Sequence, residues 1–211
     1  MDPLEPRQGG ADPWRQDAVL EGSLVRLEPL SPDHLAGLCA VGLDPALWEL
    51  ALSDIDGPEA MRRYLDTALA ERARGASLPF AQVERASGRV VGSTRLGSLE
   101  PRHRRAEIGW TWLAAPWQRT GINAEAKLLL LAHAFDVLGC VRVELKTDAR
   151  NARSRAAILR LGAMEEGTLR RHMITERGHM RDSVYFSVLA DEWPAVRAGL
   201  AARLARRPAA P

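Results

Sequence analysis

The residues of this sequence best suited to chemistry form a short turn, residues 118–124, with the sequence Gln-Arg-Thr-Gly-Ile-Asn-Ala. It joins two apolar segments, residues 107–113 and 124–138, in an order typical of strand, turn and helix. The first N–H groups of a helix lack intrahelical partners, and the helix dipole adds partial positive charge at that end. Gly121 has no Cβ, so a ligand can approach the backbone closely. The turn is therefore predicted to bind the phosphate or pyrophosphate of a cofactor.

Other chemical signatures are absent from the sequence. It contains no G-x-G-x-x-G dinucleotide fingerprint, no G-x-x-x-x-G-K-[ST] P-loop and no G-x-S-x-G nucleophile elbow. The five histidines lack the spacing of metal ligands, so no metal site is expected. What remains besides the turn is a second helix start, Asn151-Ala152-Arg153-Ser154.

Composition limits the class of protein. The chain has 211 residues, 46% of them hydrophobic, and a formal net charge of +2, which favours one globular domain and gives no reason to expect nucleic acid as a partner. The two cysteines, Cys39 and Cys140, lie far apart, as expected in a reducing compartment. The sequence shows neither a secretory signal nor an apolar run of membrane-spanning length. We expect a cytoplasmic protein without a membrane partner.

The elements that position the turn follow from hydrophobic periodicity and turn residues. We predict a flexible leader over residues 1–18, one domain over residues 19–204 and a tail over residues 205–211. Predicted strands cover residues 23–30, 78–84, 89–99, 107–113, 140–147, 163–173 and 179–189. Predicted helices cover residues 34–41, 45–51, 57–75, 124–138, 151–161 and 192–206.

The order of these elements predicts an α/β (α+β) fold. Residues 107–147 form a strand–helix–strand unit, which requires a parallel pair of strands, whereas the flanking hairpins are antiparallel. The result is a mixed, mostly antiparallel sheet flanked by helices. On the strand before the turn, Ile108, Trp110 and Trp112 alternate and are predicted to share one face.

Two motifs at this spacing resemble those of the GNAT (Gcn5-related) N-acetyltransferases, and within them the ribosomal-protein Nα-acetyltransferase-like group. The family turn Q/R-x-x-G-x-G/A matches at Gln118 and Gly121 and departs at Asn123, where a small residue is usual. The second motif, N-x-x-S-x-x-A-I-x-x-L-G-F/A, matches from Asn151 to Ala163. The resemblance covers about residues 22–193 and implies the GNAT fold, whose one parallel pair of strands splays apart.

The resemblance also implies a cosubstrate, acetyl-CoA, and no metal. Its pantetheine arm would lie between the splayed strands and pair with the edge of residues 107–113, like an added strand. Its pyrophosphate would sit on the amides of the turn, Asn151 would bond a pantetheine amide, and Ser154 would approach the sulfur. The predicted cofactor-binding residues are Trp112, Leu113, Gln118, Arg119, Thr120, Gly121, Ile122, Asn123, Ala124, Asn151 and Ser154.

The implied reaction is direct attack of a neutral primary amine on the thioester. Glu107 is the candidate for accepting the amine proton, directly or through water, although it could instead only satisfy an arginine such as Arg95. Ser154 is the candidate beside the leaving sulfur. A backbone N–H near Trp112 or Leu113 is the expected oxyanion donor.

Several roles stay open. Many family members carry a tyrosine as general acid in the helix of residues 151–161, which has none here, so Tyr185 is only a reserve. Lys127 is interpreted as a solvated residue or a phosphate contact, and His172 as a surface residue. Residues 45–56, with Trp48, are candidates for the acceptor pocket.

The acceptor is a protein N-terminus or a small-molecule amine. The alternatives are a succinyl-CoA donor and a non-catalytic acyl-CoA-binding module that regulates a partner. A homodimer is left open.

Overall fold

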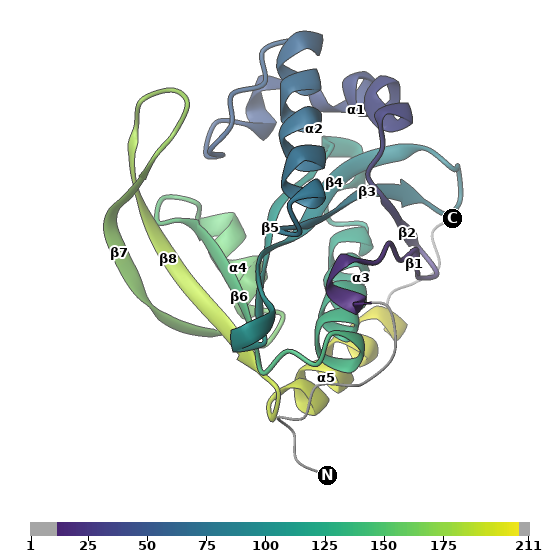
Figure 1. The fold of residues 1–211 in the computed structure, drawn as a ribbon, viewed down its shortest axis with the longest axis vertical. Helices are drawn as coiled ribbons and strands as arrows, with labels where there is room; N and C mark the ends of the chain where they lie inside the picture. The colour runs from purple at the N-terminus through teal and green to yellow at the C-terminus, as the bar shows by residue number, and fades with distance from the viewer. Residues whose placement is uncertain (1–11, 207–211) are drawn as a thin grey trace.

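The computed structural model describes residues 12–206, which contain one eight-stranded sheet (Figure 1). Its strand order is β1-β2-β3-β4-β5-β6-β8-β7. The strands are β1 (Leu20–Glu21), β2 (Val25–Pro29), β3 (Leu78–Glu84), β4 (Val90–Glu100), β5 (Arg105–Leu113), β6 (Arg142–Asp148), β7 (Met164–Ile174) and β8 (Met180–Leu189).

Helices cover the sheet on both faces. They are α1 (Leu35–Gly42), α2 (Pro58–Ala73), α3 (Ile122–Ala132), α4 (Ala152–Leu159) and α5 (Trp193–Ala205), and a π-helical turn (His133–Val137) extends α3. Side chains of α3 and α5 share one apolar core with the sheet, and those of α1 and α2 share a second core. Phe80 belongs to the first core and its neighbour Ala81 to the second, so the two cores lie on opposite faces.

The predicted mixed sheet with one parallel pair is confirmed. β5 and β6 pair in parallel through Arg105–Arg142, Ala106–Val143 and Glu107–Glu144, and every other strand pair is antiparallel in residues 12–206. No pairing of β5 with β6 continues beyond Glu107 and Glu144 in the described chain, so the two strands diverge from there. A gap thus opens along residues 108–113 of β5.

The prediction that Ile108, Trp110 and Trp112 share one face is wrong. Ser93 of β4 pairs with Trp112 of β5, and Arg95 pairs with Gly109. Between these two pairs β4 has one residue and β5 has two. This bulge is built on Trp110, whose φ is 50°. An extra residue reverses the alternation, so Ile108 packs in the α3 core and Trp112 in the α2 core.

Most of the expected leader, residues 1–11, lies outside the described residues, as does most of the expected tail. Within the described part of the leader, Trp14 is buried and packs into the α3 core. Between residues 12 and 206, no helix combines the length and the apolar character needed to cross a membrane.

Candidate functional site

The turn before α3 presents free backbone donors. Gly121, the N-cap residue, has φ 92°, and its carbonyl accepts the first helical hydrogen bond from the Glu125 N–H at 2.9 Å. Within the described chain, no group accepts from the N–H groups of Ile122, Asn123 and Ala124. Arg119 also has positive φ, 65°, which together with Gly121 gives the turn its tight path. Three free amides at a helix start suit an anion such as pyrophosphate.

Gln118 joins the turn to its surroundings. Its Nε2 donates to the Leu113 carbonyl at 2.8 Å, and its Oε1 accepts from Arg153 of α4 at 2.9 Å. The Thr120 hydroxyl donates to the Trp117 carbonyl. These side chains therefore fix the turn to the end of β5 and bring the starts of α3 and α4 together.

The second motif forms the start of α4. The Asn151 Oδ1 accepts from the Ser154 N–H at 2.9 Å, and the Asn151 N–H donates to the Asp148 carbonyl at 2.9 Å. Asn151 is thus the N-cap, which leaves its side-chain NH₂ as the group available to a ligand. Ser154 is half-buried in the first turn of the helix.

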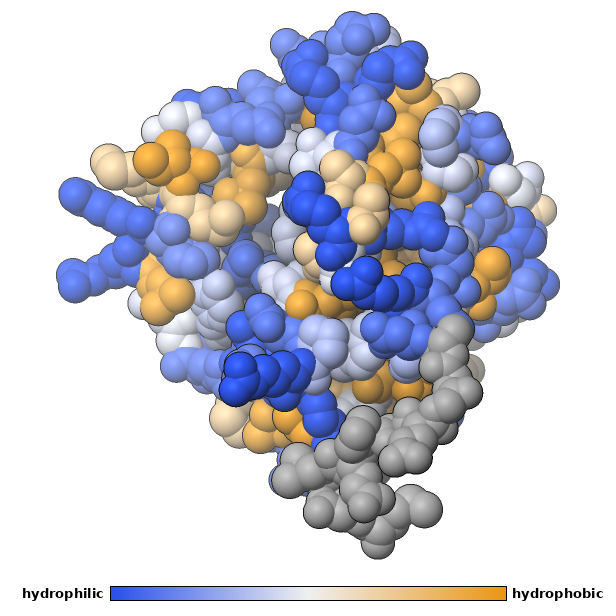
Figure 2. All heavy atoms as spheres, in the orientation of Figure 1, coloured by the Kyte–Doolittle hydropathy of each residue, from blue (hydrophilic) through white to orange (hydrophobic). Residues whose placement is uncertain are grey.

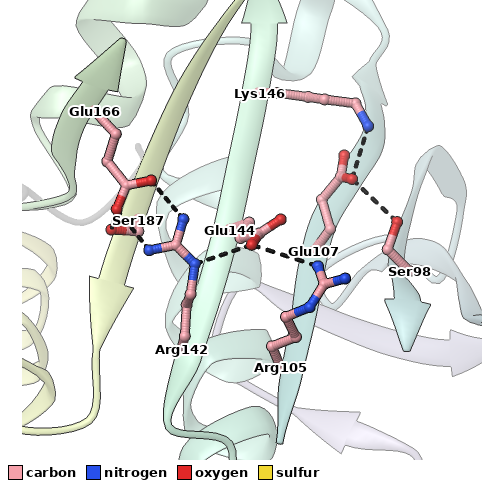
Figure 3. A network of polar contacts seen from close by, with 8 residues as sticks. All are labelled: Ser98, Arg105, Glu107, Arg142, Glu144, Lys146, Glu166 and Ser187. Atoms are coloured by element: carbon pink, nitrogen blue, oxygen red, sulfur yellow. Dashed lines mark hydrogen bonds and ion pairs between the residues drawn. The ribbon is translucent and has the colours of Figure 1, made fainter. Parts of the chain in front are cut away.

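Glu107 is buried and paired with a residue that the sequence did not suggest. Its Oε2 accepts from Lys146 Nζ at 2.8 Å and from Ser98 Oγ at 3.2 Å (Figure 3). Arg95, the partner considered from the sequence, instead pairs with Glu71 at 2.9 Å. Among the described residues, no group donates to Glu107 Oε1, which lies beside Gly109.

Lys146 lies between two aromatic rings. Its Nζ is 5.9 Å from the ring centroid of Trp110 and 5.7 Å from that of Tyr185, within the range of cation–π attraction. The alternation of β6 is the feature of the sequence that could have indicated the pairing of Lys146 with Glu107. It puts Lys146 on the same face as Glu144, which is the parallel partner of Glu107.

The same face carries a row of charges across the sheet. Arg105 and Arg142 both contact Glu144, and Arg142 also binds Glu166 of β7, which accepts from Ser187 of β8 (Figure 3). The bonds from Arg142 lower the pKa of Glu166 to about 2, against the opposing effect of burial. Figure 2 shows this side hollowed between the projecting β7–β8 hairpin and α2.

His172 is not the free surface residue that the sequence suggested. Its ring stands edge-on to Tyr185 with centroids 5.5 Å apart, and its Nδ1 is buried without a partner in the described chain. Burial lowers its pKa, and the nearby charges of Lys146 and Arg181 lower it further. The pairing of β7 with β8 is irregular between Leu169 and Met173, where Arg171 has φ 49°.

A cavity of about 260 Å³ lies over Trp110, between α2 and the tip of the β7–β8 hairpin. Its walls include Tyr64, Arg95 and, from the predicted acceptor region, residues 53–55. The hairpin tip is fastened over it: the Asp54 N–H donates to Glu176 at 2.7 Å, and Arg177 pairs with Asp54 at 2.6 Å. Other residues with side chains in the wall are Ala60, Arg63, Thr67, Glu71 and Glu176.

Two further expectations fail. Trp48 does not line the cavity but packs in the α2 core against Trp112, with ring centroids 5.3 Å apart. Lys127 is not solvated: it is 6% exposed, and its Nζ donates to Thr111 Oγ1. No group of three or more His, Cys, Asp or Glu side chains within residues 12–206 could hold a metal ion.

Comparison with known families places these features in context. The model described as "Acetyltransferase (GNAT) domain" matches residues 25–164. A crystal structure of a GCN5-related N-acetyltransferase from Brucella melitensis superposes with a TM-score of 0.83 at 33% identity, covering 90% of this chain and 87% of that one. The expected GNAT fold is confirmed.

The names of two other relatives mention an acceptor or a ligand. YdaF of Bacillus subtilis strain 168, whose name proposes a ribosomal N-acetyltransferase, is 36% identical over 106 residues, 50% of this chain and 57% of YdaF. The match thus spans little more than half of that relative. RimJ of Mycobacterium smegmatis, solved with CoA-disulfide, superposes with a TM-score of 0.74 at 26% identity and covers 90% of this chain and 96% of that one.

Proposed function

This chain belongs to the GNAT acetyltransferase family, and from that premise we propose that it transfers an acetyl group from acetyl-CoA to a primary amine. The observation that carries the proposal is that the chain has both free amides at the start of α3 and a gap between β5 and β6. We assign the activity to one domain, residues 19–204, with Trp14 packed against it.

In this proposal the amides of Ile122, Asn123 and Ala124 bind the pyrophosphate of acetyl-CoA, with Arg119 beside them. Each interaction at a helix end contributes only about 0.3–1 kcal/mol, so several must act together. The pantetheine arm lies along β5, where the edge facing β6 is unpaired beyond Glu107. The Asn151 NH₂ donates to a pantetheine amide, and Ser154 lies near the sulfur.

The proposed chemistry runs on the face that carries Glu107. The amine nitrogen attacks the thioester carbon, the carbon–sulfur bond breaks, and the amine proton passes to Glu107 Oε1, directly or through water. Lys146 and Ser98 hold the other carboxylate oxygen and so orient the side chain. A backbone N–H of β5 near Trp112 or Leu113 donates to the thioester oxygen, a bond worth about 3 kcal/mol in the transition state.

We further propose that the acceptor is a protein N-terminus, which enters through the cavity over Trp110. Three carboxylates, those of Asp54, Glu71 and Glu176, line the cavity. Asp54 and Glu71 are paired with Arg177 and Arg95, so an incoming amine would have to share or displace those arginines. The ribosomal N-acetyltransferase named in YdaF supports a protein acceptor over a small amine.

A thiol-release assay with acetyl-CoA tests the function. We expect turnover with peptides that begin with a free amine and none with the same peptides blocked at the N-terminus. Polyamines and aminoglycosides test the small-molecule alternative, and succinyl-CoA tests the donor. Tight CoA binding without turnover for any acceptor would favour the regulatory binding module.

Replacing Gly121 by Val tests the pyrophosphate site. A β-branched residue at φ 92° is strained, so the turn will shift and the free amides will lose their alignment. We expect acetyl-CoA to bind at least about tenfold more weakly, a loss of about 1.4 kcal/mol, in calorimetric titration. Gly178→Val is the matched control, because Gly178 has φ 77° and open space around it in the tip of the β7–β8 hairpin, which bonds to residues 52–54 and not to the turn at Gly121. Equal affinities for the two variants would count against the site.

A further inference from the structure

Lys127 is a buried cation that the proposed chemistry leaves without a role. It lies in α3, about one turn after the free amides, and only 6% of its surface is exposed. Its Nζ donates to Thr111 Oγ1, which lies 2.7 Å from Thr94 Oγ1. No carboxylate of residues 12–206 forms an ion pair with it. Burying an ammonium without a counter-ion is costly, so its retention calls for a reason.

The location of its partner supplies that reason. Thr111 belongs to the bulge of β5, next to Trp110, and lies in the segment that no longer pairs with β6. The bulge is held from the opposite face by Tyr64, whose hydroxyl donates to the Trp110 carbonyl at 3.3 Å. Lys127 therefore approaches, from the α3 face, the stretch of strand along which the thioester is proposed to lie.

We propose that Lys127 is a positioning residue for acetyl transfer, which fixes the Thr111 bulge and whose ammonium favours negative charge in the gap between β5 and β6. The inference rests on the proposed function. During transfer, electron density moves first to the thioester oxygen and then to the sulfur as the carbon–sulfur bond breaks. The amine proton goes to Glu107, and Lys127 keeps its own proton throughout.

The electrostatics of the site agree with this role. Burial alone lowers the pKa of Lys127 from its usual 10.5 to about 7. Lys127 bonds the Thr111 hydroxyl of β5, which is bonded in turn to the Thr94 hydroxyl of β4, and no charged side chain contributes to the shift. An anion in the gap would favour the ammonium and so raise the pKa of Lys127.

The sequence offers a direct probe, because Lys127 and Lys146 are its only lysines. Full-length protein labelled at lysine Cε gives two NMR signals, which Lys127→Met assigns. We expect the Lys127 signal to titrate near pH 7 without ligand, and its midpoint to rise more with CoA than with desulfo-CoA. Desulfo-CoA keeps the phosphates but lacks the sulfur, so it separates the effect of the thiol end from that of the phosphates.

Three outcomes are distinct. A larger rise of the Lys127 midpoint with CoA than with desulfo-CoA supports the inference. Equal midpoints with CoA and desulfo-CoA, when calorimetry shows that both bind, overturn the inference and leave the proposed function standing. Failure of CoA to bind at all overturns the proposed function, and the inference with it.

Kinetics give an independent readout. We expect Lys127→Met to lower kcat about tenfold, to change the KM for acetyl-CoA less than about twofold and to unfold no more readily than the parent, because Met removes a buried charge. The ratio of parent to variant kcat should fall as pH rises above 7, through the raised pKa of Lys127 in the acetyl-CoA complex, because the parent loses its ammonium there. A ratio independent of pH, or a kcat within twofold of the parent, would overturn the inference.

Discussion

Glu107→Gln lowers kcat for acetyl transfer by about 10²–10³-fold, while acetyl-CoA still binds with the affinity of the parent. The amide oxygen of Gln can still accept from Lys146 and Ser98, which bind one oxygen of Glu107 at 2.8 and 3.2 Å. What the amide cannot do is accept a proton at the position of Oε1. The variant therefore removes the proton acceptor and leaves the packing in place, and steady-state kinetics with calorimetry will separate the two effects.

Glu144→Gln is the control for this experiment. Glu144 is the parallel partner of Glu107 on β6 and shares its face, but its contacts are Arg105 and Arg142. We expect the kcat of Glu144→Gln to stay within about threefold of that of the parent. If Glu107→Gln kept a similar kcat and lost only thermal stability, Glu107 would be a structural partner of Lys146 and the proposed role would fall.

Glu125→Ala lowers the free energy of unfolding by about 3–5 kcal/mol, which is a large fraction of the stability of a single domain. The buried Glu125 carboxylate accepts four hydrogen bonds from the turn before β2 and from the first residue of that strand: from Ser23 N at 2.9 Å, Ser23 Oγ at 2.7 Å, Leu24 N at 2.7 Å and Val25 N at 2.8 Å. Alanine leaves these donors without an acceptor, and it removes an acidic group from the first turn of α3, where the dipole favours it.

Denaturant unfolding of the parent and the variant will measure this loss. Glu165→Ala serves as control, because the ion pair of Glu165 with Arg155 at 3.4 Å is exposed and is worth less than about 1 kcal/mol. A loss below about 1 kcal/mol for Glu125→Ala would mean that these four donors find other partners or water in the variant.

Local patterns predicted most of the elements correctly. The strand predicted at residues 78–84 agrees with β3, Leu78–Glu84. Both of its signals, a run rich in apolar residues and the hairpin turn that follows it, are local in the sequence. The bulge at Trp110 could not be predicted in this way. A bulky residue with φ 50° is unfavourable on its own, and only the pairing of β5 with β4 imposes it.

The features of the site also divide into local ones, which the sequence reveals, and long-range ones, which it does not. The turn at Gly121 and the cap at Asn151 are local, so short motifs reveal them. The pair of Glu107 and Lys146 joins residues 39 positions apart, and it depends on the parallel register of β5 and β6. The burial of Lys127 had one signal in the sequence: Leu131, four residues later on the same helical stripe, is apolar and buried.

The most direct test of the account is a single-turnover experiment with acetyl-labelled acetyl-CoA, an excess of the protein and a peptide with a free N-terminus. Direct attack predicts that, after an acid quench, the label moves from CoA to the peptide amine without appearing on the protein. Label retained on the protein would contradict direct attack. Label that stays on bound acetyl-CoA would contradict the transferase function itself.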